Sequence, residues 1–99
     1  MCEFKIIDQS SGSQIGEDIL ILSYTEENEL IYRDVLGFGE KLKSALIMDV
    51  NTVSQKCTVL QHPLIKDFLS IIRNLSANNL EKSEIENFQE KINALKASI

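Results

Sequence analysis

Cysteine 2 is the residue of this 99-residue chain whose type and position most favour metal chemistry. A thiolate is a soft donor, and removal of Met1 would place the α-amine beside it, so that both close a five-membered N,S chelate on one ion. With Met1 retained, its amine, the Cys2 amide nitrogen and the Cys2 sulfur would form two fused chelate rings. Nickel, copper and zinc all suit such donors, and Cys2 is therefore the candidate metal ligand.

One cysteine cannot fill a coordination sphere by itself. A symmetric dimer that joined two N-termini would supply two nitrogens and two sulfurs to one ion. Two other interpretations of Cys2 stay open: a small residue that opens a strand, and an N-terminal nucleophile. The nucleophile has the least support, because such catalysis needs an oxyanion pocket and positioned partners.

The remaining candidates favour structural roles. His62, the single histidine, precedes Pro63 outside any ligand-spaced pair, which predicts a hinge or a contact at the start of a helix. Cys57 and Met48 lie in predicted strands and are expected in the core. We find no paired acid and base, no triad and no cofactor loop in the sequence, which argues against an enzyme.

The charge of the chain is acidic and unevenly distributed. Ten Lys and Arg stand against fifteen Asp and Glu, and the whole excess of five lies before residue 63. Such a surface repels nucleic-acid phosphates and anionic membranes and tolerates cations. No apolar run approaches the roughly 18 residues of a membrane span, and the N-terminus lacks signal-peptide features, so we expect a cytoplasmic protein without membrane partners.

The first 60 residues alternate in the manner of short strands. Cys2, Phe4 and Ile6 share one face of the first predicted strand. Further strands are predicted at 18–25, 30–35, 46–50 and 54–60, with an irregularity near 44–45. Five short strands with brief connections favour a small antiparallel barrel or a half-open sheet.

The hydrophobic period becomes helical after His62. Apolar spacing and Pro63 predict a helix over 63–75, and a second helix follows, capped either by Asn79 or by a Ser83–Glu86 capping box. The second helix carries apolar residues at a and d spacing, namely Ile85, Phe88, Ile92 and Leu95. We therefore expect an α+β chain with a β-barrel at 1–61 and a helical hairpin at 62–99, whose stripes bury against each other, the barrel or a second subunit.

Several segments, taken in order, resemble the CooT-like family. That family is named after a nickel-insertion accessory protein of carbon monoxide dehydrogenase, and its archaeal members are often labelled predicted RNA-binding proteins. The matching segments are Met1–Lys5, Glu17–Asp18, Arg33–Gly37, Lys41–Leu42 and Ile47–Val50. The resemblance covers residues 1 to about 60, and the hairpin is an addition to the compact family pattern.

The resemblance implies a fold, a metal and a partner. The fold would be a small SH3-like antiparallel β-barrel of about five strands that forms a homodimer. The function would be that of a metallochaperone that binds Ni(II) through Cys2 and passes it to an acceptor apo-enzyme. One alternative is RNA binding through Lys5, Arg33, Lys41 or Lys43, against which the acidic balance counts; another is a protein-interaction module built on the hairpin.

Overall fold

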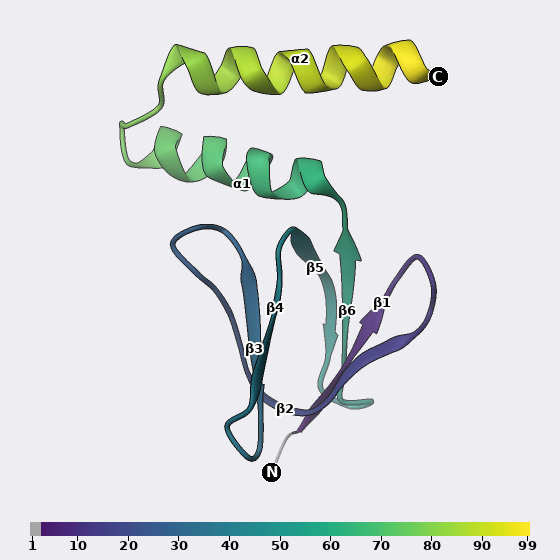
Figure 1. The fold of residues 1–99 in the computed structure, drawn as a ribbon. Helices are drawn as coiled ribbons and strands as arrows, with labels where there is room; N and C mark the ends of the chain where they lie inside the picture. Colours follow the sequence, from purple (N-terminus) through teal and green to yellow (C-terminus); the bar gives the residue numbers. More distant parts are fainter. Residues whose placement is uncertain (1–2) are drawn as a thin grey trace.

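The fold, seen in a computed structural model that describes residues 3–99, is a six-stranded sheet followed by two helices (Figure 1). The strands are β1 (Phe4–Asp8), β2 (Gln14–Tyr24), β3 (Leu30–Asp34), β4 (Gly39–Leu42), β5 (Ala45–Asn51) and β6 (Lys56–Gln61). The helices are α1 (Pro63–Ser76) and α2 (Lys82–Ser98). The predicted α+β class is confirmed.

The sheet is mixed, with the strand order β4-β3-β2-β1-β6-β5. Neighbouring strands pair antiparallel except for β1 and β6, which are parallel with Ile6 opposite Cys57. The parallel pair arises because the β5–β6 hairpin brings the chain back along β1 in the direction in which β1 itself runs. The sheet therefore joins its first strand to its last.

The prediction of an antiparallel barrel of about five strands is wrong. There are six strands, and within residues 3–99 the edge strands β4 and β5 do not pair with each other. The irregularity predicted near 44–45 lies at Ser44, between the end of β4 and the start of β5. There the Ser44 carbonyl accepts the His62 N–H at 3.2 Å, and the Ser44 hydroxyl accepts the Lys66 N–H at 2.8 Å. These bonds turn the chain toward α1, so that β5 continues against β6 and leaves the sheet open.

A tyrosine side chain occupies part of the open edge. The Tyr24 hydroxyl, from the end of β2, donates to the carbonyl of Ala45 at 2.8 Å and accepts from the N–H of Ile47 at 3.2 Å. Backbone groups of an edge strand need partners when they are shielded from water. Tyr24 thus supplies to β5 two of the bonds that a neighbouring strand would have made.

The core lies inside the bend of the sheet. Ile6, Leu30 and Val59 are fully buried, and the alternation predicted for the first strand is confirmed from Phe4 to Asp8. The core placement of Met48 is wrong, since its side chain is 48% exposed. A register shift between Ile47 and Asp49 in the β5–β6 ladder breaks the alternation at this residue.

The two helices form an antiparallel pair at one end of the sheet, with α1 between the sheet and α2 (Figure 1). The predicted first helix is confirmed, but neither predicted cap of the second is right. The N-cap of α2 is Glu81. Asn79 instead donates its N–H to the Asn74 carbonyl and so belongs to the end of α1, while Ser83 already lies inside α2.

Candidate functional site

The predicted metal ligand, Cys2, lies outside the described residues 3–99, so its role stays a prediction. The described chain next to it begins the strand β1, which pairs with β2 on one side and with β6 on the other. The register places Phe4 opposite Ile19 and Ile19 opposite Asp34, so that the start of β1 lies at the same end of the sheet as the β3–β4 turn. The β5–β6 turn reaches this end too, because Lys5 pairs with Lys56.

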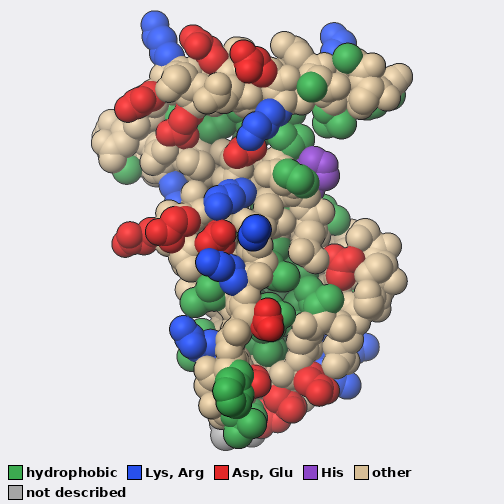
Figure 2. All heavy atoms as spheres, viewed as in Figure 1, with side chains coloured by type: hydrophobic (Ala, Val, Ile, Leu, Met, Phe, Trp, Pro, Cys, Tyr) green, Lys and Arg blue, Asp and Glu red, His purple; other side chains and the backbone are tan. Residues whose placement is uncertain are grey.

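Exposed apolar side chains gather at this end of the sheet (Figure 2). We call the group the apolar tip: Val35, Leu36, Phe38 and Val53, which are 43%, 77%, 72% and 94% exposed. A single exposed apolar residue needs no explanation, but Val35, Leu36 and Phe38 share the β3–β4 turn, and several together are typical of an interaction surface. Val53 stands on the β5–β6 turn at the same end, across the strands β2 and β1.

The turns that carry the apolar tip are held by side-chain caps. Asp34 Oδ1 accepts the N–H groups of Leu36 and Phe38 at 2.9 and 3.0 Å, and Gly37 takes the positive φ of 87° that the turn requires. In the β5–β6 turn, Asn51 Oδ1 accepts the Val53 N–H at 2.9 Å. The apolar side chains are therefore presented by well-bonded turns.

Cys57 is a core residue, as predicted, and its thiol is unsuited to metal capture. It is 1% exposed and lies opposite Ile6 in the β1–β6 pair. Burial, and secondarily the negative charge of Asp49, raises the pKa of the Cys57 thiol above its ordinary value. A metal binds the thiolate, so a buried thiol with a raised pKa is a poor ligand near neutral pH.

His62 begins α1, which confirms its predicted contact at the start of a helix. Its backbone is extended and its Nδ1 atom accepts the N–H of Leu64 at 3.1 Å. Its carbonyl accepts the N–H of Ile65. With Pro63 at the first helical position, the first turn of α1 has its free N–H groups satisfied by the chain itself.

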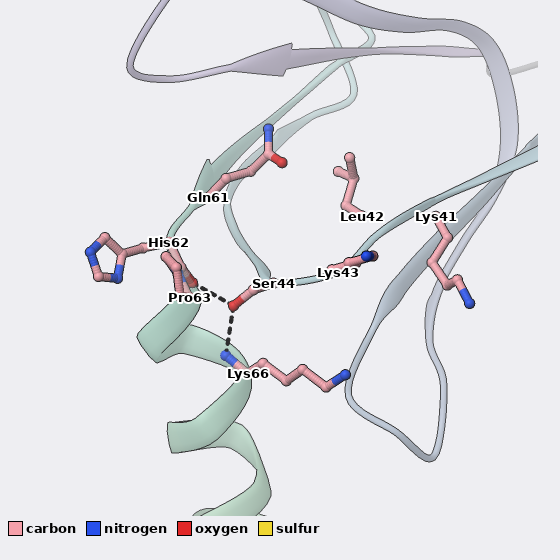
Figure 3. A pocket seen from close by; sticks show the side chains of 8 residues that line it. All are labelled: Lys41, Leu42, Lys43, Ser44, Gln61, His62, Pro63 and Lys66. Carbon is pink, nitrogen blue, oxygen red and sulfur yellow. Dashed lines mark hydrogen bonds between the residues drawn. The ribbon is translucent and has the colours of Figure 1, made fainter. Parts of the chain in front are cut away.

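A pocket of about 600 Å³ opens where β6 is followed by α1 (Figure 3). Its lining is mainly basic and polar and consists of Lys41, Leu42, Lys43, Ser44, Gln61, His62, Pro63 and Lys66. Most of these polar groups already have partners. Ser44 bridges the His62 carbonyl and the Lys66 N–H, and Gln61 donates to Asp8. The pocket therefore marks the junction of sheet and helix.

Glu29 forms ion pairs with two of the lysines of this pocket. Its carboxylate lies 3.2 Å from Lys41 Nζ and 3.5 Å from Lys66 Nζ, and its side chain is 14% exposed. The hydrogen bond from Lys41, together with both lysine charges, lowers the pKa of Glu29. Sequence reasoning missed this residue, because its partners lie on β4 and α1 and no local pattern joins them.

Three of the four basic residues of the RNA alternative lie near one another, and the fourth lies apart. Lys41 and Lys43 line the pocket described above, and Arg33 shares a neighbouring groove with Lys41. Lys5 lies on β1, which is two strands away from β3 in the sheet. With Lys41 paired to Glu29, this arrangement offers little free positive charge to a phosphate backbone.

A complete metal centre is not found within the part of the chain that the structure describes. Across residues 3–99, no group of three or more His, Cys, Asp or Glu side chains is placed to hold an ion. With Cys57 buried, Cys2 stays the predicted thiolate ligand, and one thiolate per chain leaves coordination positions that a second copy could fill.

None of the helices in the described chain is long and apolar enough to cross a membrane. Compared with models of known families, the sequence matches none, and no curated protein shows significant similarity to it. The CooT-like resemblance stays a prediction.

Proposed function

We propose that this protein is a nickel-binding accessory protein that holds Ni(II) through the Cys2 thiolates of two copies and delivers it to an acceptor apo-enzyme in the cytoplasm. The CooT-like resemblance is part of this proposal, and with it the kinship of the bent, open sheet to a small SH3-like barrel. The nickel ion is the cargo, and the residues of the protein serve to capture and release it.

The observation that carries the proposal is the apolar tip. Its four side chains stand at the end of the sheet from which β1 begins, the strand that directly follows Cys2. Burial of apolar surface drives association, so two copies that meet at this tip would bring their Cys2 residues into one neighbourhood. The acidic charge of the first 62 residues adds attraction for a cation.

The chemistry of the described donors supports the same assignment. Cys57 is buried, which raises the pKa of its thiol, and His62 uses Nδ1 to cap α1. A site formed by few, surface-near ligands exchanges its ion readily, which suits a protein that must pass the metal on.

Native mass spectrometry of the protein, untagged at its N-terminus and titrated with Ni(II), tests the proposal. We expect one nickel per two chains in the wild type and none in Cys2→Ser. Cys57→Ala is the matched control, because it removes the other thiol and leaves Cys2 in place; it should keep the nickel. Nickel that survives in Cys2→Ser, or that never binds the wild type, contradicts the proposal.

The apolar tip provides a second variant. Phe38 is 72% exposed, so Phe38→Glu should leave the fold of one copy intact while placing charge on the surface that we assign to the dimer. We expect the nickel affinity to fall at least tenfold. An affinity equal to that of the wild type would show that the tip does not assemble the site.

A further inference from the structure

The helical hairpin leaves an apolar face uncovered on α1. Phe68, Ile72 and Leu75 recur at steps of four and three residues, so they lie on one side of the helix, and they are 51%, 41% and 57% exposed. The side of α1 that faces the sheet is a different one. There Lys66 contacts Glu29, and Arg73 donates to the Thr25 carbonyl at 2.7 Å.

Along one edge of the hairpin, polar side chains of α1 and α2 contact each other. Lys91 of α2 lies 2.6 Å from Asp67, and Glu84 accepts from Ser70 and Asn74 at 3.3 and 2.6 Å. Phe68 and Leu75 each follow one of these polar α1 residues by one position, which turns them about 100° around the helix. The apolar row of α1 therefore runs along the edge of the hairpin that lies opposite these polar contacts.

The helix α2 extends the same surface. Its apolar residues follow the heptad pattern, and the first of them pack on α1, with the rings of Phe68 and Phe88 centred 6.1 Å apart. The later ones are left in solvent: Ile92 and Leu95 are 40% and 43% exposed. We call the combined surface the hairpin face: Phe68, Ile72, Leu75, Ile92 and Leu95. A heptad stripe of this kind is typical of a helix that packs against another helix.

The charge pattern of α2 favours a second copy of this chain as the occupant. Residues 81–90 carry four glutamates and one lysine, whereas 91–99 carry two lysines and no acidic side chain. Glu84 and Lys91 contact α1, so the charges left for a second copy are mainly Glu81, Glu86 and Glu90 in the first half and Lys96 in the second. Two copies of α2 placed antiparallel would set each acidic half beside a basic half. A parallel pair would set like charges together.

We propose that the hairpin face pairs with the same face of a second copy about a twofold axis, with the two α2 helices antiparallel. The molecule measures 45 × 33 × 22 Å, and the helices lie across its long dimension at one end (Figure 1). When two copies are related by a twofold axis parallel to the long dimension, their α2 helices run in opposite directions, as the charge pattern requires.

The same axis sets the two apolar tips side by side at the other end. This part of the inference rests on the proposed function, which needs both Cys2 residues in one dimer. Interfaces on two separate twofold axes would instead extend into open chains of copies.

Sedimentation velocity of the full, metal-free chain over a range of concentrations tests the hairpin pairing. We expect the wild type at twice 11.2 kDa and the double variant Ile72→Lys/Leu75→Lys as a monomer, with a dissociation constant raised at least tenfold. Both substituted residues are exposed in the single copy, so circular dichroism should be unchanged. Asn93→Lys is the control: it lies two residues after Lys91, about 200° around α2 from the contact with Asp67, and should stay dimeric.

The outcomes separate this inference from the nickel proposal. A double variant that remains dimeric overturns the hairpin pairing, whatever the nickel count. A wild type that stays monomeric at about 100 μM overturns it too, whether or not the chain captures vesicles or another protein. A dimer lost in the double variant supports the pairing even if Cys2→Ser still binds nickel, a result that would refute the nickel proposal alone.

Discussion

Asp8 is a carboxylate that the fold keeps ionised. It is 8% exposed and accepts hydrogen bonds from the hydroxyl groups of Ser11 and Ser10 at 2.8 and 2.9 Å, and from Gln61 at 3.3 Å. These bonds, the one from Ser11 foremost, lower the pKa of Asp8. The folded-state pKa is thus below the unfolded value of about 3.9, so the stabilisation is complete above that pH and is lost as the pH falls through the folded-state pKa.

Asp8→Asn should therefore flatten the acid side of the stability curve. We expect the free energy of unfolding of the wild type to fall more steeply than that of the variant below about pH 4, since the variant has no proton to take up at this position. Urea denaturation between pH 6 and 2.5 measures the two slopes. Glu27→Gln, an exposed change in the β2–β3 turn, is the control and should keep the wild-type slope; parallel curves for Asp8→Asn and the wild type would refute the prediction.

Single residues were predictable from the sequence where their role is local. The burial of Cys57 follows from its place in a strand, and the capping role of His62 follows from the proline after it. Glu29 and Ser44 could not be found in this way, because their partners lie at least 12 residues away in the chain. The metal role of Cys2 stays a prediction.

The N-cap of α1 gives a test for the start of a helix. His62→Ala removes the acceptor of the Leu64 N–H and should lower the free energy of unfolding by about 1 kcal/mol. His62→Asp should be at least as stable as the wild type, because the first turn of α1 has no acidic residue to meet its partial positive charge. Thermal and urea unfolding give the order of the three proteins.

The matched control for this test is the N-cap of α2. The Glu81 side chain makes no capping hydrogen bond, so Glu81→Ala should change the stability by less than about 0.5 kcal/mol. Equal losses at both positions would show that the His62 imidazole does not act as a cap.

The open edge at β5 gives a test for the sheet. Tyr24→Phe leaves the Ala45 carbonyl and the Ile47 N–H without their shared partner, which should cost about 1–3 kcal/mol. Tyr32→Phe is the comparison, since Tyr32 makes one such bond, to the Ile15 carbonyl at 3.1 Å, and should cost about 1 kcal/mol. A Tyr24 variant as stable as the Tyr32 variant would mean that the two-bond bridge contributes no more than a single hydrogen bond.

Elements with a clear period were predictable, and their pairing was not. Alternation located most strands, and helical spacing located both helices. The sequence indicated an irregularity near 44–45 but not the separate strand β4, because nothing in residues 41–50 indicates that Ser44 bonds to the start of α1. The parallel partnership of β1 and β6 is equally absent from local sequence, since it depends on which strand edges remain free once the hairpins have formed.

Amide hydrogen exchange should detect the proposed dimer, because pairing would protect the amides of α2. In one copy, residues 89–99 of α2 are exposed throughout, so their hydrogen bonds should open readily. In the proposed dimer the second copy covers this half, and the wild type should protect its amides more strongly than Ile72→Lys/Leu75→Lys does. Exchange at Ile6, in the core of the sheet, serves as the internal control, and equal exchange of α2 in both proteins would contradict the dimer.

The β1–β6 pair can form only late in the synthesis of the chain, after β6 has been added. About 50 residues separate the two strands in the chain, which a ribosome adds in roughly 3–10 s. Through that interval one side of β1 stays an open strand edge with unsatisfied backbone groups, next to the apolar residues Phe4 and Ile6. A nascent chain stalled before Lys56 is thus the species most exposed to aggregation, and slow codons placed just ahead of β6 would lower the yield of folded protein more than the same codons placed after it.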